Sequence, residues 1–405
     1  MVDYELIVVG AGPSGSTLAR RAALLGLDVL LIDKVKYPRY KACAGALSSK
    51  VIKQLDFEID SVIQRKISGF SIIAPSGFRV NFIPEDRSNP GFTIMRDEFD
   101  YLLLQKAQEA GAHVKEECML VGVTEEKDMV IATLKDGSII TSKYLAGADG
   151  VNSTVAKELG FYYGWKGDSV GVAIEVEAEV SSETIRNICG EPSGYEADLF
   201  FLYFGDIPHG YMWCFPKRSI LSFGGWCRQD KVKMLRQKYQ QWYSRFKEKY
   251  ELNNPKIIID TAARFPVSTA KKIAKGRSIL IGDAAGLVDP FTGEGIPHAI
   301  HSGIIAAGIL NKAIENDDPK ILKLYEKQVK KTIVQELKVS LSMAKLFYKN
   351  SKNMETLCRI FRDDQYANYL LSASIGGLMS PKDVKKKFTW RLIKTRPLEA
   401  ISLFF

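Results

Sequence analysis

The feature that most constrains the fold of this chain is a glycine-rich turn close to its N-terminus. An apolar run at 6–9 leads into the pattern Gly-x-Gly-x-x-Gly at 10–15, and a helical pattern follows over 16–26. The first glycine permits a tight turn, the second lets the backbone approach a pyrophosphate, and the third lets the helix pack closely on the sheet. Free N–H groups at the helix start favour phosphate charge. The residues predicted to contact a dinucleotide here are Gly10, Gly12, Pro13, Ser14 and Gly15.

A second strand-like run at 28–32 ends in an acid. Asp33 closes this run about 20 residues beyond the glycines, where a carboxylate is placed to accept a hydrogen bond from a ribose hydroxyl. Lys34 belongs to the same predicted site. The alternative is a glycine-rich turn in an ordinary βαβ unit. Strand, glycines, helix, strand and acid occur in order, however, and this order favours the dinucleotide site.

Length, composition and charge exclude several classes of protein. With 405 residues, 46% apolar and 25% charged, the chain is expected to be a soluble globular protein of two domains, or of one with a large insertion. The net charge of +9 is spread widely, so no nucleic-acid partner is expected. No apolar run reaches the ~20 residues of a membrane span. Asp3 and Glu5 stand where a signal peptide needs positive charge, so the expected location is cytoplasmic.

The cysteines and histidines predict no metal site. The six cysteines include no Cys-x-x-Cys pair, so zinc or iron–sulfur ligation is not expected. Such sparse cysteines indicate free thiols in a reducing compartment. His298 and His301 share one helical face but lack a third ligand, which favours packing or capping over metal binding.

The nucleotide-binding fold is interrupted twice, and the expected fold class is α/β. We expect a discontinuous Rossmann-like FAD-binding domain, an inserted antiparallel β-sheet that forms a substrate domain, and a C-terminal helical region. The expected ranges are 1–65, 91–160 and 267–318 for the first, 66–90 and 161–266 for the second, and 319–405 for the third. This discontinuity favours a flavoprotein over a plain NAD dehydrogenase.

Three ordered motifs resemble those of the FAD-dependent aromatic hydroxylase superfamily. They are the glycine-rich turn, Gly-Ala-Asp-Gly at 147–150 and Gly-Asp-Ala-Ala-Gly at 282–286. The resemblance implies FAD as the cofactor, with Arg96 near the flavin and its phosphates and Asp283 on the ribityl chain or the pyrophosphate. It also implies that the helix after Asp283 points its N-terminus at the flavin. Taken singly, Asp149 could be only a turn residue and Asp283 only a helix cap.

Within that superfamily, residues 1 to about 310 resemble the geranylgeranyl reductase family. Lys-Ala-Cys-Ala-Gly at 41–45 is similar to its cysteine-bearing loop, 210–217 to its Tyr-x-Trp-x-Phe-Pro motif, and 286–296 to its flavin-proximal loop. Ala44 and Ala46 flank a single glycine where many relatives carry more. The resemblance implies further cofactor-binding residues, namely Ala44, Gly45, Asp149, Gly150, Gly293, Gly295 and Ile296.

The same resemblance implies a reductase that saturates C=C bonds of isoprenoid chains, carried by membrane lipids or prenyl diphosphates. Such a chain needs an apolar cleft. Tyr211, Trp213 and Phe215 share one face of a strand by period-two alternation and could line that cleft with Pro290. The alternative is an aromatic face in an ordinary sheet core.

Saturation needs a hydride from reduced flavin and a proton. Cys43, Tyr211 and a flavin-bound water are the candidate proton sources, and Arg39 and Lys41 flank Cys43 with charges that favour a thiolate. A small buried side chain is the alternative for Cys43. The electron donor is external, whether NAD(P)H, ferredoxin or another carrier. Two rival functions share the scaffold: a flavin monooxygenase or halogenase, and a non-enzymatic prenyl-binding escort protein.

The C-terminal stretch 382–396 carries seven basic residues and one acid. Phe388, Trp390, Leu392 and Ile393 are interleaved with them, and the apolar tail 401–405 follows. A segment of cationic and aromatic residues suits the headgroup boundary of an anionic bilayer, so we expect peripheral membrane contact. The alternative is a solvated basic helix whose apolar residues cover the core.

Overall fold

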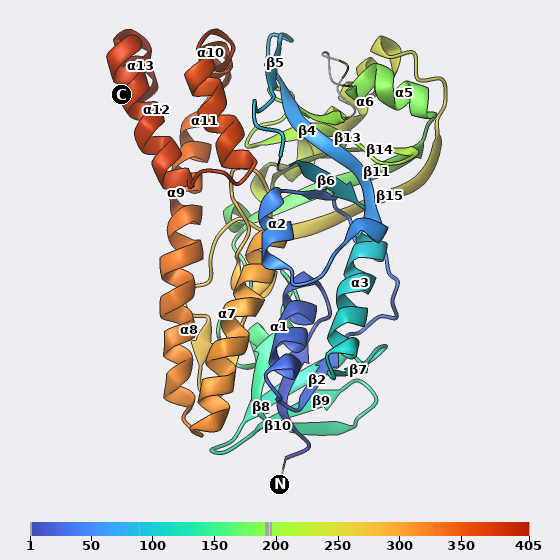
Figure 1. Cartoon of the computed structure of the whole chain (residues 1–405), viewed down its shortest axis with the longest axis vertical. Helices are drawn as coiled ribbons and strands as arrows, with labels where there is room; N and C mark the ends of the chain where they lie inside the picture. The colour runs from blue at the N-terminus through green and yellow to red at the C-terminus, as the bar shows by residue number, and fades with distance from the viewer. Residues whose placement is uncertain (1, 89, 191–193, 195–196, 405) are drawn as a thin grey trace. The chain divides into compact units, whose positions relative to one another are not determined.

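The computed structural model describes residues 2–88, 90–190, 194 and 197–404, and the chain forms two compact units (Figure 1). Each unit is discontinuous in sequence because the chain passes from one to the other several times. The first unit consists of 1–41, 96–170 and 265–337, and the second of 42–95, 171–264 and 338–405.

This division differs from the predicted one at 42–65 and in the C-terminal region. Residues 42–65 join the second unit because β3 (Ala46–Leu47) pairs with β6 (Gly91–Ile94) in its sheet. The helical region predicted at 319–405 is not a unit of its own. Its first part joins the first unit, where α8 (Leu322–Val329) packs beside α7 (Ile296–Glu315), and the rest joins the second.

An eight-stranded sheet forms the centre of the first unit, in the order β16-β17-β10-β1-β2-β7, with β9 on β10 and β8 on β9. All neighbours from β17 to β7 are parallel. Short, fully apolar runs suit such strands because both sheet faces are buried. α1 packs against both α3 and α7 (Figure 1). The remaining bounds are β1 (Tyr4–Val9), α1 (Pro13–Leu24), β2 (Val29–Ile32), α3 (Arg96–Glu109), β7 (His113–Lys115), β8 (Leu120–Glu125), β9 (Val130–Leu134), β10 (Ile139–Gly147), α4 (Thr154–Glu158), β16 (Ala274–Lys275) and β17 (Ser278–Leu280).

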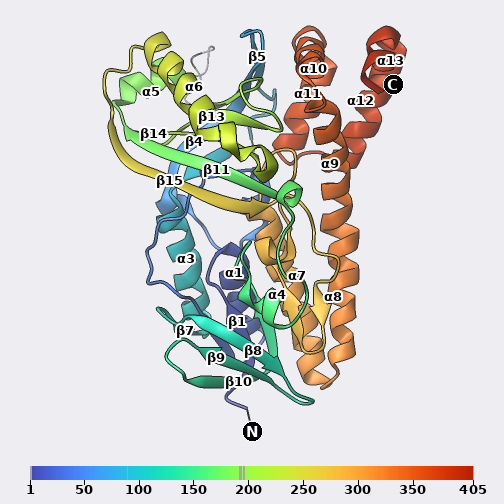
Figure 2. The same ribbon diagram turned by 180° about the vertical axis from the view of Figure 1, so that it is seen from behind.

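A nine-stranded sheet forms the second unit, in the order β15-β11-β14-β13-β12-β4-β6-β3, with β5 on β4. α5 and α6 cover one face of it (Figure 2). Met212, Cys214 and Phe223 point to that face and pack with Trp242 and Phe246. The bounds are α2 (Ser49–Gln54), β4 (Ile63–Ile73), β5 (Arg79–Phe82), β11 (Val170–Glu179), α5 (Ser182–Cys189), β12 (Asp198–Tyr203), β13 (Gly210–Pro216), β14 (Ile220–Arg228), α6 (Leu235–Lys249) and β15 (Lys256–Pro266).

The second sheet is mixed, whereas the sequence predicted an antiparallel one. β12 pairs in parallel with β4, from Asp198 beside Ile67 to Tyr203 beside Ile73. A long stretch of chain separates these strands, so β12 can enter the sheet from the same end as β4. Alternating side chains reveal which face a residue occupies but not the direction of the neighbouring strand.

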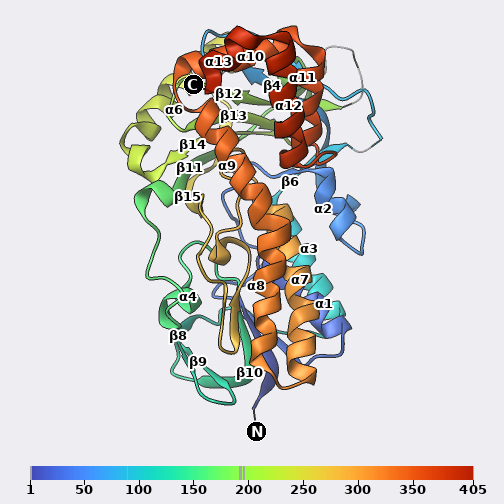
Figure 3. The same ribbon diagram turned by 90° about the vertical axis from the view of Figure 1, so that its left-hand side faces the viewer.

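The C-terminal helices pack in sequence order within the second unit (Figure 3). α10 and α11 also contact β5. The bounds are α9 (Gln335–Phe347), which begins in the first unit, α10 (Ser351–Asp363), α11 (Gln365–Ile375), α12 (Pro381–Thr395) and α13 (Pro397–Phe404). Among the residues that the structure describes, no helix has the length and apolar character needed to cross a bilayer.

Candidate functional site

The glycine-rich turn lies in the first unit, between β1 and α1, and its glycines differ in what they permit. Gly10 has φ +102°, and a Cβ there would come within 2.5 Å of the Ala148 carbonyl oxygen. A Cβ at Gly15 would collide with the carbonyl of Gly10. At Gly12 the nearest atom to an added Cβ is Nη2 of Arg39, at 4.0 Å. The space beside Gly12 is therefore open, as the approach of a pyrophosphate requires.

Two long helices begin beside this turn. Within the described residues, neither α1 at Gly12 nor α7 at Gly295 has a side chain that caps its N-terminus. Ser14 of α1 lies close to α7 and to the third motif. An added Cβ at Gly303 of α7 would come 2.7 Å from the Ser14 carbonyl oxygen, and one at Gly282 of the third motif would come 2.6 Å from the Ser14 Oγ. Both helix starts carry partial positive charge, so this part of the unit favours an anion.

Asp33 at the end of β2 braces the glycine-rich turn. Its Oδ2 accepts hydrogen bonds from the amide of Ala11 (2.7 Å) and the hydroxyl of Tyr37 (3.3 Å), and its Oδ1 accepts from the amide of Val35 (3.1 Å). Lys34 is exposed. Asp33 is thus positioned at the glycine-rich turn, and its carboxylate stabilises the backbone there by accepting hydrogen bonds from two amides.

A buried cluster of two arginines around one acid lies at the start of α3. Arg96 donates to both oxygens of Asp100, from Nε at 2.8 Å and Nη2 at 2.7 Å, and Nη1 of Arg39 lies 2.8 Å from Oδ2. Burial alone would raise the pKa of Asp100. The charges and hydrogen bonds of Arg96, with the charge of Arg39, outweigh it and lower that pKa below its ordinary value. Asp100 is therefore an anchor that fixes both guanidinium groups beside the glycine-rich turn.

The third motif places Asp283 near the start of α7. An added Cβ at Gly295 would lie 3.6 Å from its Oδ1, and Nζ of Lys41 lies 3.9 Å from its Oδ2. The loop before α7 is closed by Asp289, whose Oδ1 accepts from the amides of Phe291 and Thr292 (2.8 and 2.9 Å). Three other predicted residues belong to this loop or helix start: Gly293, with φ +75°, and the buried Pro290 and Ile296.

Asp149 has a local role that its motif left open. Its Oδ1 accepts from the hydroxyl of Ser153 (2.6 Å), and its Oδ2 accepts from the amides of Thr154 and Val155 (2.7 and 3.1 Å). The carboxylate therefore caps α4, and burial raises its pKa. Gly150 has φ +79°, and nothing lies within 4 Å of a Cβ added there.

These residues fit an FAD cofactor. The turn gives open backbone at Gly12, two uncapped helix starts attract a pyrophosphate, and cationic groups stand at Arg39, Lys41 and Arg96. In the sequence, Arg39 and Lys41 stand out only as neighbours of Cys43, and Asp100 has no predicted role. Two basic residues in a loop after the second strand, where ligands bind in such folds, were the signal that could have found them.

The cysteine-bearing loop passes into the second unit at residue 42. Cys43 and Ala44 are half-buried, and Gly45, with φ +79°, lies so close to the Ile94 carbonyl that no side chain fits. The amide of Ile94 donates to the Gly45 carbonyl at 2.9 Å. This glycine therefore ties the loop to β6.

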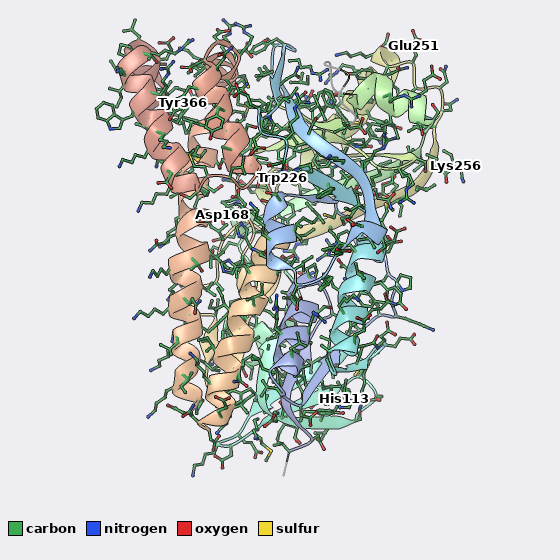
Figure 4. The ribbon with its side chains drawn as sticks, viewed as in Figure 1. His113, Asp168, Trp226, Glu251, Lys256 and Tyr366 are labelled. Carbon is green, nitrogen blue, oxygen red and sulfur yellow. The ribbon has the colours of Figure 1, made fainter. Side chains whose placement is uncertain are left out.

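The predicted aromatic residues share one face of β13, opposite the face that α5 and α6 cover. Tyr211 and Trp213 are neighbours on it, with ring centroids 6.3 Å apart, and Tyr211 also meets Trp226 of β14 at 5.7 Å (Figure 4 labels Trp226). Phe215 packs on Phe200 at 4.4 Å. The three predicted rings are each more than nine-tenths buried. This set of rings on β12, β13 and β14 is called the aromatic face below.

A double glycine makes room for this arrangement. An added Cβ at Gly224 would overlap the indole of Trp213, and one at Gly225 would overlap the thioether of Met212. The two glycines of β14 thus accept one side chain of β13 on each face of the sheet. The Gly224–Gly225 pair, which follows the Tyr-x-Trp-x-Phe-Pro motif in the sequence, therefore has a packing reason.

Comparisons with known proteins agree with this geometry. Residues 3–338 match a family model described as an FAD binding domain. The chain is 30% identical to digeranylgeranylglycerophospholipid reductase 1 of Methanococcoides burtonii, over 98% of this chain and 95% of that one. It is similar to the crystal structure of a geranylgeranyl bacteriochlorophyll reductase-like protein from Thermoplasma acidophilum, with TM-score 0.79 and 26% identity over 95% of this chain and 98% of the other. A flavin-dependent brominase shares the fold, with TM-score 0.74 and 18% identity over 97% of this chain and all of the other.

Proposed function

From the premise that this chain belongs to the FAD-binding family that includes the digeranylgeranylglycerophospholipid reductases, we propose that it saturates C=C bonds in the geranylgeranyl chains of membrane lipids. The observation that carries this proposal is the aromatic face, a buried hydrocarbon surface on the second sheet that suits a ligand made of hydrocarbon. The test is whether the protein adds hydrogen pairs to a prenyl chain, measured by mass spectrometry.

In this proposal the first unit holds FAD. Gly12 and the starts of α1 and α7 receive the pyrophosphate, and Arg39 and Arg96, held by Asp100, add positive charge. Reduced FAD supplies a hydride, after an external carrier has reduced it. The N-terminus of α7 favours the negative charge of a reduced flavin placed before it. Asp283 and Lys41 then orient the cofactor at that end.

The second unit binds the prenyl chain. Tyr211, Trp213 and Phe215 exclude water from it and align one double bond at a time. An isolated alkene has no electron sink, so a proton must arrive with or before the hydride. Cys43 and Tyr211 stand as proposed proton donors by their chemistry. Arg39 and Lys41 pair with Asp100 and Asp283, so their charges are shared with acids of the first unit.

We also propose that the C-terminal helices rest on the membrane that carries the substrate. Trp390 and Ile393 on α12 and Leu398 and Ile401 on α13 are all more than half exposed, beside the exposed lysines of α12 and two tyrosines of α11, of which Figure 4 labels Tyr366. An anionic bilayer suits a surface of basic and apolar side chains.

The docking surface is smaller than the sequence predicted. Phe388 is half-buried and packs on Phe361 with ring centroids 5.5 Å apart, and Leu392 is fully buried, so both pack within the second unit. Phe405 of the predicted tail lies outside the described residues. The exposed members named above therefore make up the proposed contact.

Replacing Trp390 and Ile393 together by alanine is expected to reduce binding to phosphatidylserine vesicles severalfold. The reason is that the apolar contact is lost while every lysine remains. Co-sedimentation at low and high salt measures it, and salt should weaken wild-type binding. The matched control replaces Leu24 and Leu25, which are half exposed in the first unit. Equal binding of wild type and the Trp390/Ile393 variant would contradict the proposal.

A further inference from the structure

A cluster of buried charged side chains lies on the second sheet, where no proposed step uses it. Glu175 and Glu177 of β11 are 1% and 0% exposed, and Lys217, just after β13, is 1% exposed. The intervening Ile174 and Val176 pack on the α5–α6 side. Because side chains alternate along a strand, both glutamates lie on the opposite side, which is that of the aromatic face.

A hydrogen-bonded chain joins Glu175 to this face. Oγ of Ser222 lies 2.5 Å from Oε1 of Glu175, and the indole Nε1 of Trp213 donates to the same Oγ at 3.2 Å. Glu175 pairs in register with Gly224, the residue that the Trp213 indole covers. The carboxyl therefore lies beneath a ring of the aromatic face, one hydroxyl away from it.

The charges of this cluster favour the protonated form of the Glu175 carboxyl. Lys217 forms an ion pair with Glu177, so Glu175 is the second carboxyl for one buried cation. Burial raises the pKa of Glu175 to about 7, although Lys217 and Ser222 lower it, and the charge of Glu177 raises it further.

Among the described residues, Lys217 is the cation whose charge acts on Glu175. Arg65 of β4 donates to the Lys217 carbonyl at 3.1 Å, but its guanidinium pairs with Asp198 of β12 at 2.9 Å. Tyr239 of α6 belongs to the opposite face of the sheet, and burial raises its pKa, so it remains neutral. Near neutral pH, Glu175 is therefore poised between carboxylic acid and carboxylate.

We propose that Glu175 stores the proton that saturates the double bond and that Ser222 passes it to a prenyl chain on the aromatic face. This inference rests on the proposed function and puts Glu175 in place of its two candidate proton donors, Cys43 and Tyr211. Glu175 acts through Ser222 and does not itself touch the chain. In the structure the Ser222 hydroxyl donates to Oε1 of Glu175 and accepts from Nε1 of Trp213. When Glu175 is protonated, its carboxyl can donate to Ser222 instead, and the hydroxyl hydrogen becomes available to a chain on the aromatic face.

The step balances as one proton and one hydride added across one C=C bond. The Ser222 hydroxyl gives its proton to one alkene carbon and takes the proton of Glu175, so the O–H bond of the carboxyl breaks and the hydroxyl is restored. The electron pair would come with the hydride that FAD, when bound and reduced, would supply to the other carbon. Lys217 offsets the carboxylate that remains, until solvent returns a proton.

The first test is infrared titration of the protein without substrate. The carbonyl band of a protonated, buried carboxyl should be present at low pH and disappear with a midpoint near pH 7. This band should be missing from the Glu175→Gln variant. It should remain in Glu179→Gln, a matched control on the same strand, where Glu179 pairs with Lys256 at the surface. A wild-type spectrum identical to that of Glu175→Gln would overturn the proposal.

The second test follows single-turnover oxidation of the reduced, FAD-loaded protein by a geranylgeranyl lipid. The wild-type rate should fall above about pH 7, and Glu175→Gln should be slower by about 10²-fold and lose this pH dependence. Ser222→Ala should be similarly slow while retaining the infrared band. Cys43→Ala and Tyr211→Phe should keep the wild-type pH profile, whatever their rates. A pH profile that disappears in either of these two variants and persists in Glu175→Gln would overturn the proposal.

The two tests separate this inference from the function on which it rests. If the wild-type protein saturates the lipid but Glu175→Gln matches it in rate and pH profile, the proton store is wrong and the reductase assignment stands. If the wild-type protein yields no saturated lipid, the reductase assignment fails, and with it the proton transfer to an alkene.

Discussion

Replacing Gly12 by leucine is expected to give a folded but colourless protein. The backbone at Gly12, with φ −72° and ψ −176°, is extended and open to any residue, and the nearest atom to an added Cβ is 4.0 Å away. The fold therefore has room for a leucine side chain. That side chain would, however, occupy the space through which a pyrophosphate must approach this backbone. Flavin absorbance after reconstitution with FAD measures the loss, and circular dichroism verifies the fold.

Gly308→Leu is the matched control for this variant. Gly308 is exposed on α7, and nothing lies within 4 Å of an added Cβ. This substitution should leave FAD binding intact and help the helix, since glycine is a poor helix former. Wild-type flavin content in Gly12→Leu would mean that the pyrophosphate does not lie at the glycine-rich turn.

Replacing Arg96 by methionine is expected to destabilise the FAD-free protein by about 3 kcal/mol or more. Asp100 is fully buried and would lose both hydrogen bonds from Arg96, so its desolvated carboxylate would keep only the charges of Arg39 and Lys41 among its described cations. Urea unfolding of wild type and variant measures the difference in the free energy of unfolding. Without FAD in the sample, the result reports on the loss of the Arg96 side chain and not on cofactor binding.

An exposed pair with the same spacing is the control for Arg96. Arg359 and Glu355 on α10 are also four residues apart, but Arg359 is 60% exposed, so Arg359→Met should cost only about 0–1 kcal/mol. The lowered pKa of Asp100 adds stability above its unfolded-state pKa, and this contribution is lost as the pH falls through the lower folded-state pKa. The cost of Arg96→Met should therefore shrink below about pH 4. Equal costs for the two arginines at pH 7 would contradict the buried-anchor account.

The dinucleotide-binding half could be predicted from the sequence because each of its signals is local. The glycines, the acid after β2 and the helix after Asp283 lie within short stretches whose order is fixed by the fold. The alternation at Tyr211, Trp213 and Phe215 was also local, and the structure confirms that they share a face. FAD as the cofactor and the reductase family are confirmed by the comparisons.

What the sequence could not predict depends on contacts between distant residues. The parallel pairing of β4 with β12 and the joining of 42–65 to the second unit are set by tertiary packing. Nothing in the sequence distinguishes Asp100 from other helical acids, because its partner Arg39 is brought beside it only by the fold. Glu175 looks like a surface residue of an alternating strand, because alternation does not say which face is covered. For the same reason the sequence left open whether Phe388 and Leu392 face a membrane or cover the core; in the structure both pack within the second unit.

The measurement that tests the central claim most directly is the mass of a geranylgeranyl lipid incubated with the FAD-loaded protein and dithionite. We predict that the mass rises in steps of one hydrogen pair per double bond, and that samples without protein, without FAD or without dithionite show no change. A lipid that binds but keeps its mass would support the escort function instead. A product that gains oxygen when air is admitted would support a monooxygenase, and either result would contradict the reductase.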